Sequence, residues 1–261
     1  MALSIIICEG KTDAILISYF LIKQYGVNFS EAAPPVKLPI QHKNQSIKWY
    51  SIKENNKPSI AILGAGGIDN IPKTLCEISE INRNASEKVR FTKIALYFDT
   101  DTRKKTDCKE LFCNWLTKAG YEYEKDKANL DNWFEASITG AFTPHHTKGV
   151  KNNEVGINIF GLALPCDSKG ALETFLLNCL QEKGDEDNKI VTAAEKYINN
   201  IKDVSYLNKR RFPKKAALGS VLSVFSPDWV FTRMDDKLKL VEWEKITDFS
   251  NSYKKLQFLT E

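Results

Sequence analysis

The chain has 261 residues, of which 43% are hydrophobic and 27% are charged, so it can bury a core without disulfides or structural metals. Its formal net charge of +4 permits an acidic partner such as nucleic acid but does not require one. The six cysteines form no CxxC pair, no apolar run is long enough to span a membrane, and charges at Glu9 and Lys11 interrupt the only candidate signal peptide. We therefore expect a reduced, cytoplasmic protein that is not a membrane protein.

Strand and helix patterns alternate in the first half of the chain. Apolar runs predict strands over residues 4–8, 59–63 and 93–98. Helical patterns follow each of them, over residues 12–25, over 69–81, and from near Asp107, where Glu110 is expected to complete a capping box. The polar segment 28–58 predicts a loop, with or without a hairpin, and the glycines of 64–67 predict a tight turn.

The second half begins with a polar and ambiguous segment, residues 121–156. A fourth strand is predicted over 157–164, and helices over 168–181, 190–201 and 213–225, the last with Pro213 at its start. This alternation indicates an α/β fold with a parallel, doubly wound sheet flanked by helices. We expect a core domain over residues 1–182, with polar insertions at 28–58 and 121–156, and a mainly helical C-terminal extension over 183–261.

Carboxylates follow two of the predicted strands. Glu9 comes directly after the first strand, Asp13 lies four residues later, and Asp99 and Asp101 follow the third strand. Loops at the carboxyl ends of parallel strands share one edge of a sheet, so these groups are expected to converge. Alternation along an extended chain would also place Asp99 and Asp101 on the same side. Clustered carboxylates repel one another, and a hard divalent cation such as Mg²⁺ or Mn²⁺ would remove the conflict.

These motifs resemble those of the TOPRIM domain. "CEGKTD" followed by a strand ending in "YFDTD" is similar to the family's Glu-Gly after the first strand and Asp-x-Asp after a later one. The resemblance covers roughly residues 3–182 and implies a compact parallel sheet flanked by helices. "GAGGIDNI" looks like the glycine turn of small stand-alone TOPRIM proteins.

Two further stretches resemble the TOPRIM nuclease module of OLD-family proteins. "GALETFLL" looks like the acidic helix that supplies another metal-site glutamate, which matches Glu173, and "FPKKAALGSVLSVFSPD" looks like the lysine-bearing C-terminal helix, which matches Lys215 with Lys214 beside it. The chain lacks the ATPase domain that precedes this module in OLD proteins, and the additional domains of primases and topoisomerases. ATP dependence and topoisomerase activity are therefore not implied.

The leading hypothesis is a Mg²⁺- or Mn²⁺-dependent phosphodiesterase, a DNA or RNA endonuclease. Two cations would activate a water and stabilise the leaving oxygen, held by five carboxylates: Glu9, Asp13, Asp99, Asp101 and Glu173. Lys215 would stabilise charge on the scissile phosphate. The nucleic-acid backbone is expected to contact a set of basic residues: Lys11, Lys209, Arg210, Arg211 and Lys214. The resemblance also suggests a role in phage defence or DNA repair, with a partner ATPase as an option.

Simpler interpretations stay open for several of these residues. Asp13 could only cap a helix, Glu173 could form a salt bridge at the rim of its helix, and residues 208–215 could be a solvated basic loop. Two rival functions are a TOPRIM module that binds nucleic acid or a partner without cutting, and a phosphoacceptor domain. The chain length and the Glu-Gly after the first strand argue against the phosphoacceptor domain.

Overall fold

The computed structural model describes residues 3–38, 44–52, 57–140, 153–229 and 231–261. Within these residues the strands are β1 (Leu3–Cys8), β2 (Asn28–Phe29), β3 (Ser46–Ser51), β4 (Ile60–Gly64), β5 (Phe91–Asp99), β6 (Glu122–Tyr123), β7 (Phe134–Gly140) and β8 (Asn153–Leu164). The α-helices are α1 (Lys11–Tyr25), α2 (Ile71–Asn84), α3 (Lys105–Lys118), α4 (Leu172–Lys183), α5 (Asp185–Asn200), α6 (Phe212–Phe225), α7 (Met234–Leu240) and α8 (Thr247–Tyr253). None of the helices in these ranges is long and apolar enough to cross a membrane.

The strands form one mixed sheet in the order β2-β3-β4-β1-β5-β8-β7-β6. β1 pairs in parallel with β4 on one side and β5 on the other, with Cys8 opposite Gly64 and Tyr97. The pairs β2–β3, β3–β4, β6–β7 and β7–β8 are antiparallel. The predicted α/β class is confirmed, whereas the prediction of a parallel sheet holds for the β4-β1-β5 centre and is wrong toward both edges.

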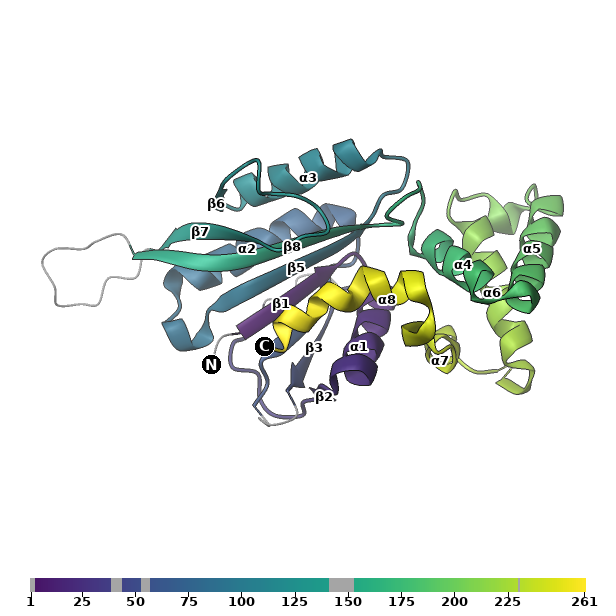
Figure 1. Ribbon diagram of the computed structural model, residues 1–261, viewed down its shortest axis with the longest axis horizontal. Helices are drawn as coiled ribbons and strands as arrows, with labels where there is room; N and C mark the ends of the chain where they lie inside the picture. The colour runs from purple at the N-terminus through teal and green to yellow at the C-terminus, as the bar shows by residue number, and fades with distance from the viewer. Residues whose placement is uncertain (1–2, 39–43, 53–56, 141–152, 230) are drawn as a thin grey trace, which may run out of the picture. The chain divides into compact units, whose positions relative to one another are not determined.

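β1 is central because both of its faces are apolar. All six residues of its sequence LSIIIC are buried, a composition typical of a parallel strand covered on both sides. Helices α2 and α3 cover one face of the sheet and α1 covers the other (Figure 1). By contrast, β7 alternates buried residues such as Ala136 and Ile138 with more exposed ones such as Glu135, the pattern of a half-exposed antiparallel strand.

Two segments contain strands that the sequence did not predict. β3 lies in the segment expected to be a loop or hairpin, and it does pair with β2, so the hairpin alternative was the correct one. β6 and β7 lie in the ambiguous segment 121–156. The expected capping box of α3 was also placed wrongly. Asp107, at the third helical position, accepts a 3.0 Å hydrogen bond from the Lys104 backbone N–H, so the helix starts earlier than predicted and Glu110 is not part of the box.

The chain divides into two compact units. Unit 1 comprises residues 1–98, 103–163 and 255–261, and unit 2 comprises 99–102 and 164–254. The division therefore falls before α4 rather than near residue 182, because α4 packs on α5, α6 and α8 and belongs with the helices. The last residues belong to the sheet unit, where the indole N–H of Trp133 donates a 2.8 Å hydrogen bond to the carbonyl oxygen of Lys255.

Candidate functional site

In unit 1, a glycine turn supports the backbone at the end of β1. The carbonyl oxygens of Cys8 and Glu9 accept hydrogen bonds from the N–H groups of Ala65 and Gly67, each 2.8 Å long. Gly67 has a φ of 132°, a backbone conformation that L side chains rarely adopt. At Gly64 a Cβ atom would lie 3.0 Å from the carbonyl oxygen of Gly10, so only glycine permits this approach. The predicted tight turn is confirmed, and its effect is to fix Glu9, which is 9% exposed.

Asp13 caps α1. Its Oδ2 atom accepts a 2.9 Å hydrogen bond from the backbone N–H of Gly10, and the residue is 8% exposed. The simpler interpretation of Asp13 as a helix cap therefore describes what the structure contains. The neighbouring Lys11, the first residue of the helix, is exposed.

The thiol of Cys8 lies beside these two carboxylates. Burial raises the pKa of this thiol well above its ordinary value, and the negative charges of Asp13 and Glu9 raise it further. A thiol with a raised pKa stays protonated at neutral pH and is a poor nucleophile. Cys8 is therefore a core residue, as the apolar run around it predicts.

In unit 2, the segment that follows β5 carries Asp99 and Asp101. Asp99 is 4% exposed, and its Oδ1 atom accepts a 2.9 Å hydrogen bond from the backbone N–H of Leu172 at the start of α4. Asp101 has a φ of 55°, so the chain is no longer extended there. The argument that strand alternation aligns the two carboxylates is therefore wrong. Hydrogen bonds hold the turn instead, because the Asp101 N–H donates to the carbonyl oxygen of Gly170 and the Thr100 N–H to that of Leu164.

Two arginines nevertheless bring both carboxylates together. Arg211 places Nη1 3.1 Å from Oδ2 of Asp99 and Nη2 2.7 Å from Oδ1 of Asp101. Arg210 places its Nη2 2.7 Å from the same oxygen of Asp101. Guanidinium forks of this kind are strong, geometrically specific partners for carboxylates. The counter-charge that the sequence analysis assigned to a metal is thus supplied, in this structure, by arginines that were expected to contact nucleic acid.

Three further predicted residues of unit 2, Glu173, Lys214 and Lys215, lie in ion pairs on helices α4, α5 and α6. Lys215 Nζ is 3.4 Å from Oε1 of Glu173, and Lys214 Nζ is 2.5 Å from Oε1 of Glu195. The rim salt bridge considered for Glu173 is therefore present. α6 begins next to Pro213 as predicted, so both lysines lie in its first turn, where a cation is unfavourable unless an anion is near. Lys209 is exposed, and its Nζ lies 5.2 Å from the centre of the Phe212 ring.

A hollow of about 220 Å³ opens between these groups within unit 2. It is lined by both signs of charge together with small polar residues: Asp101, Thr102, Gly170, Ala171, Glu173, Thr174, Arg210, Arg211 and Lys214. Such a lining suits a ligand that itself combines a cation with an anion, such as a metal ion with a phosphate group. We call this set of residues, together with Asp99 and Lys215, the arginine–carboxylate site.

The donor set fits a hard cation by its chemistry. Carboxylate oxygens of Asp99, Asp101 and Glu173 are the ligands that Mg²⁺ and Mn²⁺ prefer. Across the described ranges, however, no three Asp, Glu, His or Cys side chains are arranged to hold a metal ion. In unit 2 the carboxylate oxygens contact guanidinium and backbone donors, so these contacts would have to change for a cation to bind.

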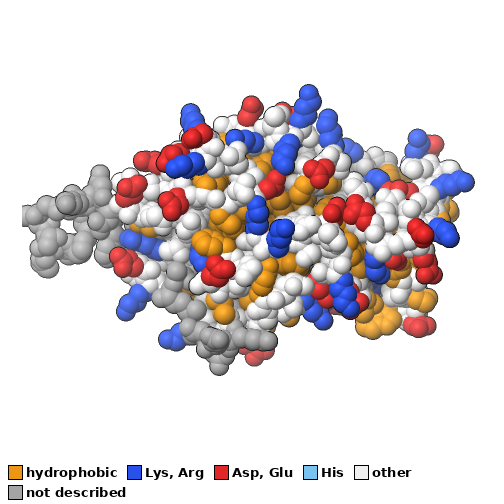
Figure 2. Space-filling view, viewed as in Figure 1, with side chains coloured by type: hydrophobic (Ala, Val, Ile, Leu, Met, Phe, Trp, Pro, Cys, Tyr) orange, Lys and Arg blue, Asp and Glu red, His pale blue; other side chains and the backbone are white. Residues whose placement is uncertain are grey.

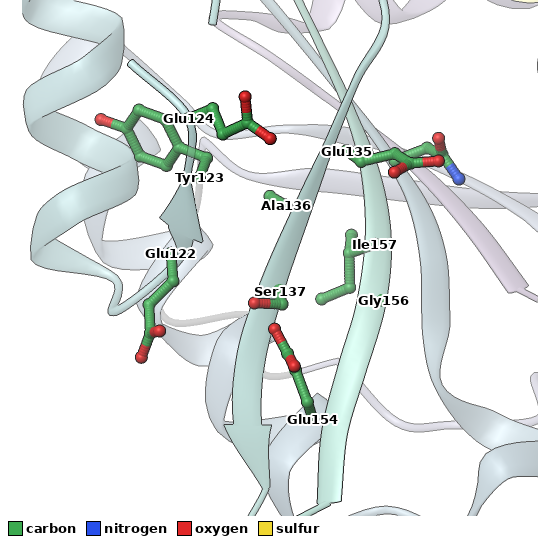
Figure 3. A pocket seen from close by; sticks show the side chains of 10 residues that line it. Glu122, Tyr123, Glu124, Glu135, Ala136, Ser137, Glu154, Gly156 and Ile157 are labelled. Atoms are coloured by element: carbon green, nitrogen blue, oxygen red, sulfur yellow. The ribbon is translucent and has the colours of Figure 1, made fainter. Parts of the chain in front are cut away.

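A second hollow, about 720 Å³, lies in unit 1 over the strands β6, β7 and β8. Four glutamates line it (Figure 3): Glu122, Glu124, Glu135 and Glu154. Gly156 opens its floor, because a Cβ atom there would meet nothing within 4 Å. This acidic hollow was missed because its glutamates fall in the segment 121–156, which was treated as ambiguous although Phe134–Gly140 alternates apolar and polar residues as a strand does. None of the predicted site residues is among those that line it.

Basic and acidic side chains are interspersed over the face seen in Figure 2, in keeping with the small net charge of the chain. Charges of both signs are also mixed within the arginine–carboxylate site, since each of its carboxylates has a cation beside it.

Fold and site together define a mixed α/β protein. One unit is built on an eight-stranded sheet, and a second, helical unit holds paired carboxylates against arginines. The chain belongs to the family described as "Protein of unknown function (DUF3226)", whose model matches residues 3–234. That description names no activity, so the TOPRIM resemblance stays a prediction.

One solved structure is similar along nearly the whole chain. It is the crystal structure of hypothetical protein PH0156 from Pyrococcus horikoshii OT3, with 16% sequence identity and a TM-score of 0.49, covering 99% of this chain and 98% of that one. At this level of likeness it assigns neither a site nor an activity. No curated protein matches the chain.

Proposed function

We propose that this protein is a metal-dependent phosphodiesterase of the TOPRIM type, acting as an endonuclease on DNA or RNA. The observation that carries the proposal is the arginine–carboxylate site, where Asp99 and Asp101 at the end of β5 share the guanidinium of Arg211. Both carboxylates are largely buried, and Asp101 lines a hollow together with Arg211. Charged side chains that converge at a hollow are candidate functional groups.

The proposed ligands of each unit have their own support. In unit 1, Glu9 is fixed by the glycine turn behind it, and Asp13 lies at the start of α1. In unit 2, Glu173 adds a third carboxylate to Asp99 and Asp101. When bound, Mg²⁺ or Mn²⁺ would act as a Lewis acid toward a phosphate oxygen.

The residues of this chain would do the rest of the chemistry. Lys215 places a positive charge beside Glu173 and would stabilise negative charge that develops on the scissile phosphate. Arg210 and Lys214 line the same hollow and would hold the nucleic-acid backbone in register. Both are largely exposed side chains, so they can turn toward a ligand at little cost.

The test is cleavage by the purified protein. Supercoiled plasmid, single-stranded DNA and single-stranded RNA are incubated with Mn²⁺, with Mg²⁺ or with a chelator, and the products are resolved on gels. We expect metal-dependent cutting of at least one substrate, and Glu9→Gln should lower the rate roughly 10²–10³-fold. The matched control is Glu135→Gln, an exposed glutamate on β7 outside the proposed site, which should cut like the wild type. Cutting that survives Glu9→Gln, or no cutting of any substrate, would contradict the proposal.

One observation favours a second function, a module that binds nucleic acid without cutting it. Arg210 and Arg211 form ion pairs with the carboxylates of Asp99 and Asp101, and so supply positive charge beside them. In that case a fluorescent oligonucleotide should bind equally well in chelator and in Mn²⁺. Affinity should fall with salt, and Lys215→Ala should weaken binding and reduce the salt dependence by about one phosphate contact. For the nuclease, Lys215→Ala should instead lower the cleavage rate much more than it weakens binding.

A further inference from the structure

The most unusual feature of unit 2 is that one guanidinium satisfies two acidic side chains. Arg211 contacts Asp99 through Nη1 and Asp101 through Nη2, at 3.1 and 2.7 Å. Arg210 adds a second guanidinium at 2.7 Å from Asp101. Two negative charges are therefore balanced by two positive charges.

The two partners differ in how firmly they are held. The Asp99 side chain is only 6% exposed and receives the backbone N–H of Leu172, which belongs to α4. The side chain of Arg211 is 31% exposed and that of Arg210 is 56% exposed. The backbone of Arg211 is anchored at the N-terminal end of α6, where its carbonyl oxygen accepts the N–H of Lys215. The guanidinium can consequently leave by side-chain rotation alone, while the carboxylates and both helices stay in place.

The space for such a movement adjoins the ion pairs. The hollow of about 220 Å³ that Arg210, Arg211 and Lys214 line is large enough to admit several waters. Thr102 and Thr174 supply hydroxyl groups to the same lining. Three cations and two hydroxyls line this space beside the carboxylates of Asp101 and Glu173, so it suits a phosphate group that a metal ion accompanies.

We propose that Arg211 is an exchangeable counter-ion: a divalent cation binding at Asp99 and Asp101 displaces it, and the released guanidinium then contacts a phosphate group of the nucleic acid in the hollow. This inference rests on the proposed function. The divalent cation takes over the neutralisation of Asp99 and Asp101 that Arg211 provides, so the carboxylates stay neutralised. The hollow meanwhile gains the positive charge of the released Arg211 guanidinium. Metal binding and phosphate binding are then coupled, and each favours the other by the same factor.

The first experiment measures Mn²⁺ affinity by titration calorimetry without nucleic acid. In Arg211→Met the competing guanidinium is absent, so Mn²⁺ should bind roughly 5- to 150-fold more tightly than in the wild type, the usual range of such couplings. The matched control is Arg233→Met, which removes the same charge from an exposed pair with Asp235 and should leave the affinity unchanged. Asp99→Asn combined with Asp101→Asn should abolish binding. If Arg211→Met does not fold, Arg211→Lys keeps the charge but loses the fork and should show a smaller gain.

The results separate the two proposals. If the wild type binds Mn²⁺, the double aspartate variant does not, and Arg211→Met binds with unchanged or lower affinity, the exchange is wrong while the metal site stands. If no variant binds Mn²⁺, the metal-dependent function fails and the exchange fails with it.

The second experiment measures the coupling directly with a fluorescent single-stranded oligonucleotide. Saturating Mn²⁺ should raise the oligonucleotide affinity of the wild type and of Arg233→Met by the same factor. In Arg211→Met this gain should shrink or vanish, because no guanidinium is released. An undiminished gain in Arg211→Met would overturn the proposed role of the arginine even if Mn²⁺ binds at the carboxylates.

Discussion

The acidic side chains of the two units are satisfied in different ways. In unit 1, the carboxylate of Asp13 accepts the backbone N–H of Gly10. In unit 2, Asp99 and Asp101 depend on the side chains of arginines more than 100 residues away along the sequence. A backbone donor is set by local geometry and is difficult to lose, whereas a side-chain donor can be removed by substitution or by rotation. The comparison indicates that the carboxylates of unit 2 are the ones whose neutralising partner can change.

The largest expected effect comes from removing the guanidinium. Arg211→Met leaves Asp99 buried without its fork and should lower the free energy of unfolding by roughly 2–4 kcal/mol. This is below the roughly 3–5 kcal/mol of a fully buried pair because the Arg211 side chain is 31% exposed. Urea unfolding followed by circular dichroism measures it. Arg233→Met, whose side chain is 71% exposed, should cost less than about 1 kcal/mol. Equal losses in the two variants would show that Asp99 does not depend on Arg211.

A smaller effect is expected at Asp13, whose carboxylate accepts the nearby backbone N–H of Gly10. Asp13→Ala removes the cap of α1 and should cost about 1 kcal/mol. Asp13→Asn keeps an oxygen acceptor for the Gly10 N–H and should cost only a few tenths of that. The same urea unfolding compares them. If Asn is as harmful as Ala, the charge of Asp13 matters more than its hydrogen bond, and the contrast with unit 2 disappears.

The ion pair between Lys215 and Glu173 in unit 2 should contribute little to the free energy of unfolding, because it is long and its lysine is exposed. Its atoms are 3.4 Å apart, and the lysine side chain is 52% exposed. Lys215→Met should therefore change the free energy of unfolding by less than about 1 kcal/mol. A loss as large as that of Arg211→Met would make the lysine a structural residue and would weaken its assignment to catalysis.

The smallest effect concerns the carboxyl pair of Glu182 and Asp248. Burial, a hydrogen bond with Asp248 and the charge of Asp248 together raise the pKa of Glu182. A raised carboxyl pKa means that the native state holds its proton more tightly, so this contribution favours folding at low pH and is lost as pH rises through the folded-state pKa. Glu182→Gln should accordingly stabilise the protein at pH 7 by a few tenths of a kcal/mol, since the group is mostly exposed. The difference from the wild type should vanish near pH 4, which thermal unfolding at the two pH values checks.

Local patterns in the sequence determined most of the helices and strands, and also the glycine turn and the helix cap beside Glu9. The buried run of β1, the glycines after β4 and Pro213 at the start of α6 each encode their structure within a few residues. Asp13 as a helix cap belongs to the same class. These features were predictable because sterics and backbone hydrogen bonding act between neighbours along the chain.

Only the tertiary structure decided the sheet edges, the boundary of the helical unit and the partners of the acidic pair. β7 pairs with β8, and its alternation of apolar and polar residues does not by itself specify that partner. The guanidinium of Arg211 reaches Asp99 because α6 packs on α4, and no spacing in the sequence encodes that packing. The sequence therefore showed that the carboxylates of this protein need a counter-charge. Which groups supply it depended on long-range contacts between side chains, which no local pattern can specify.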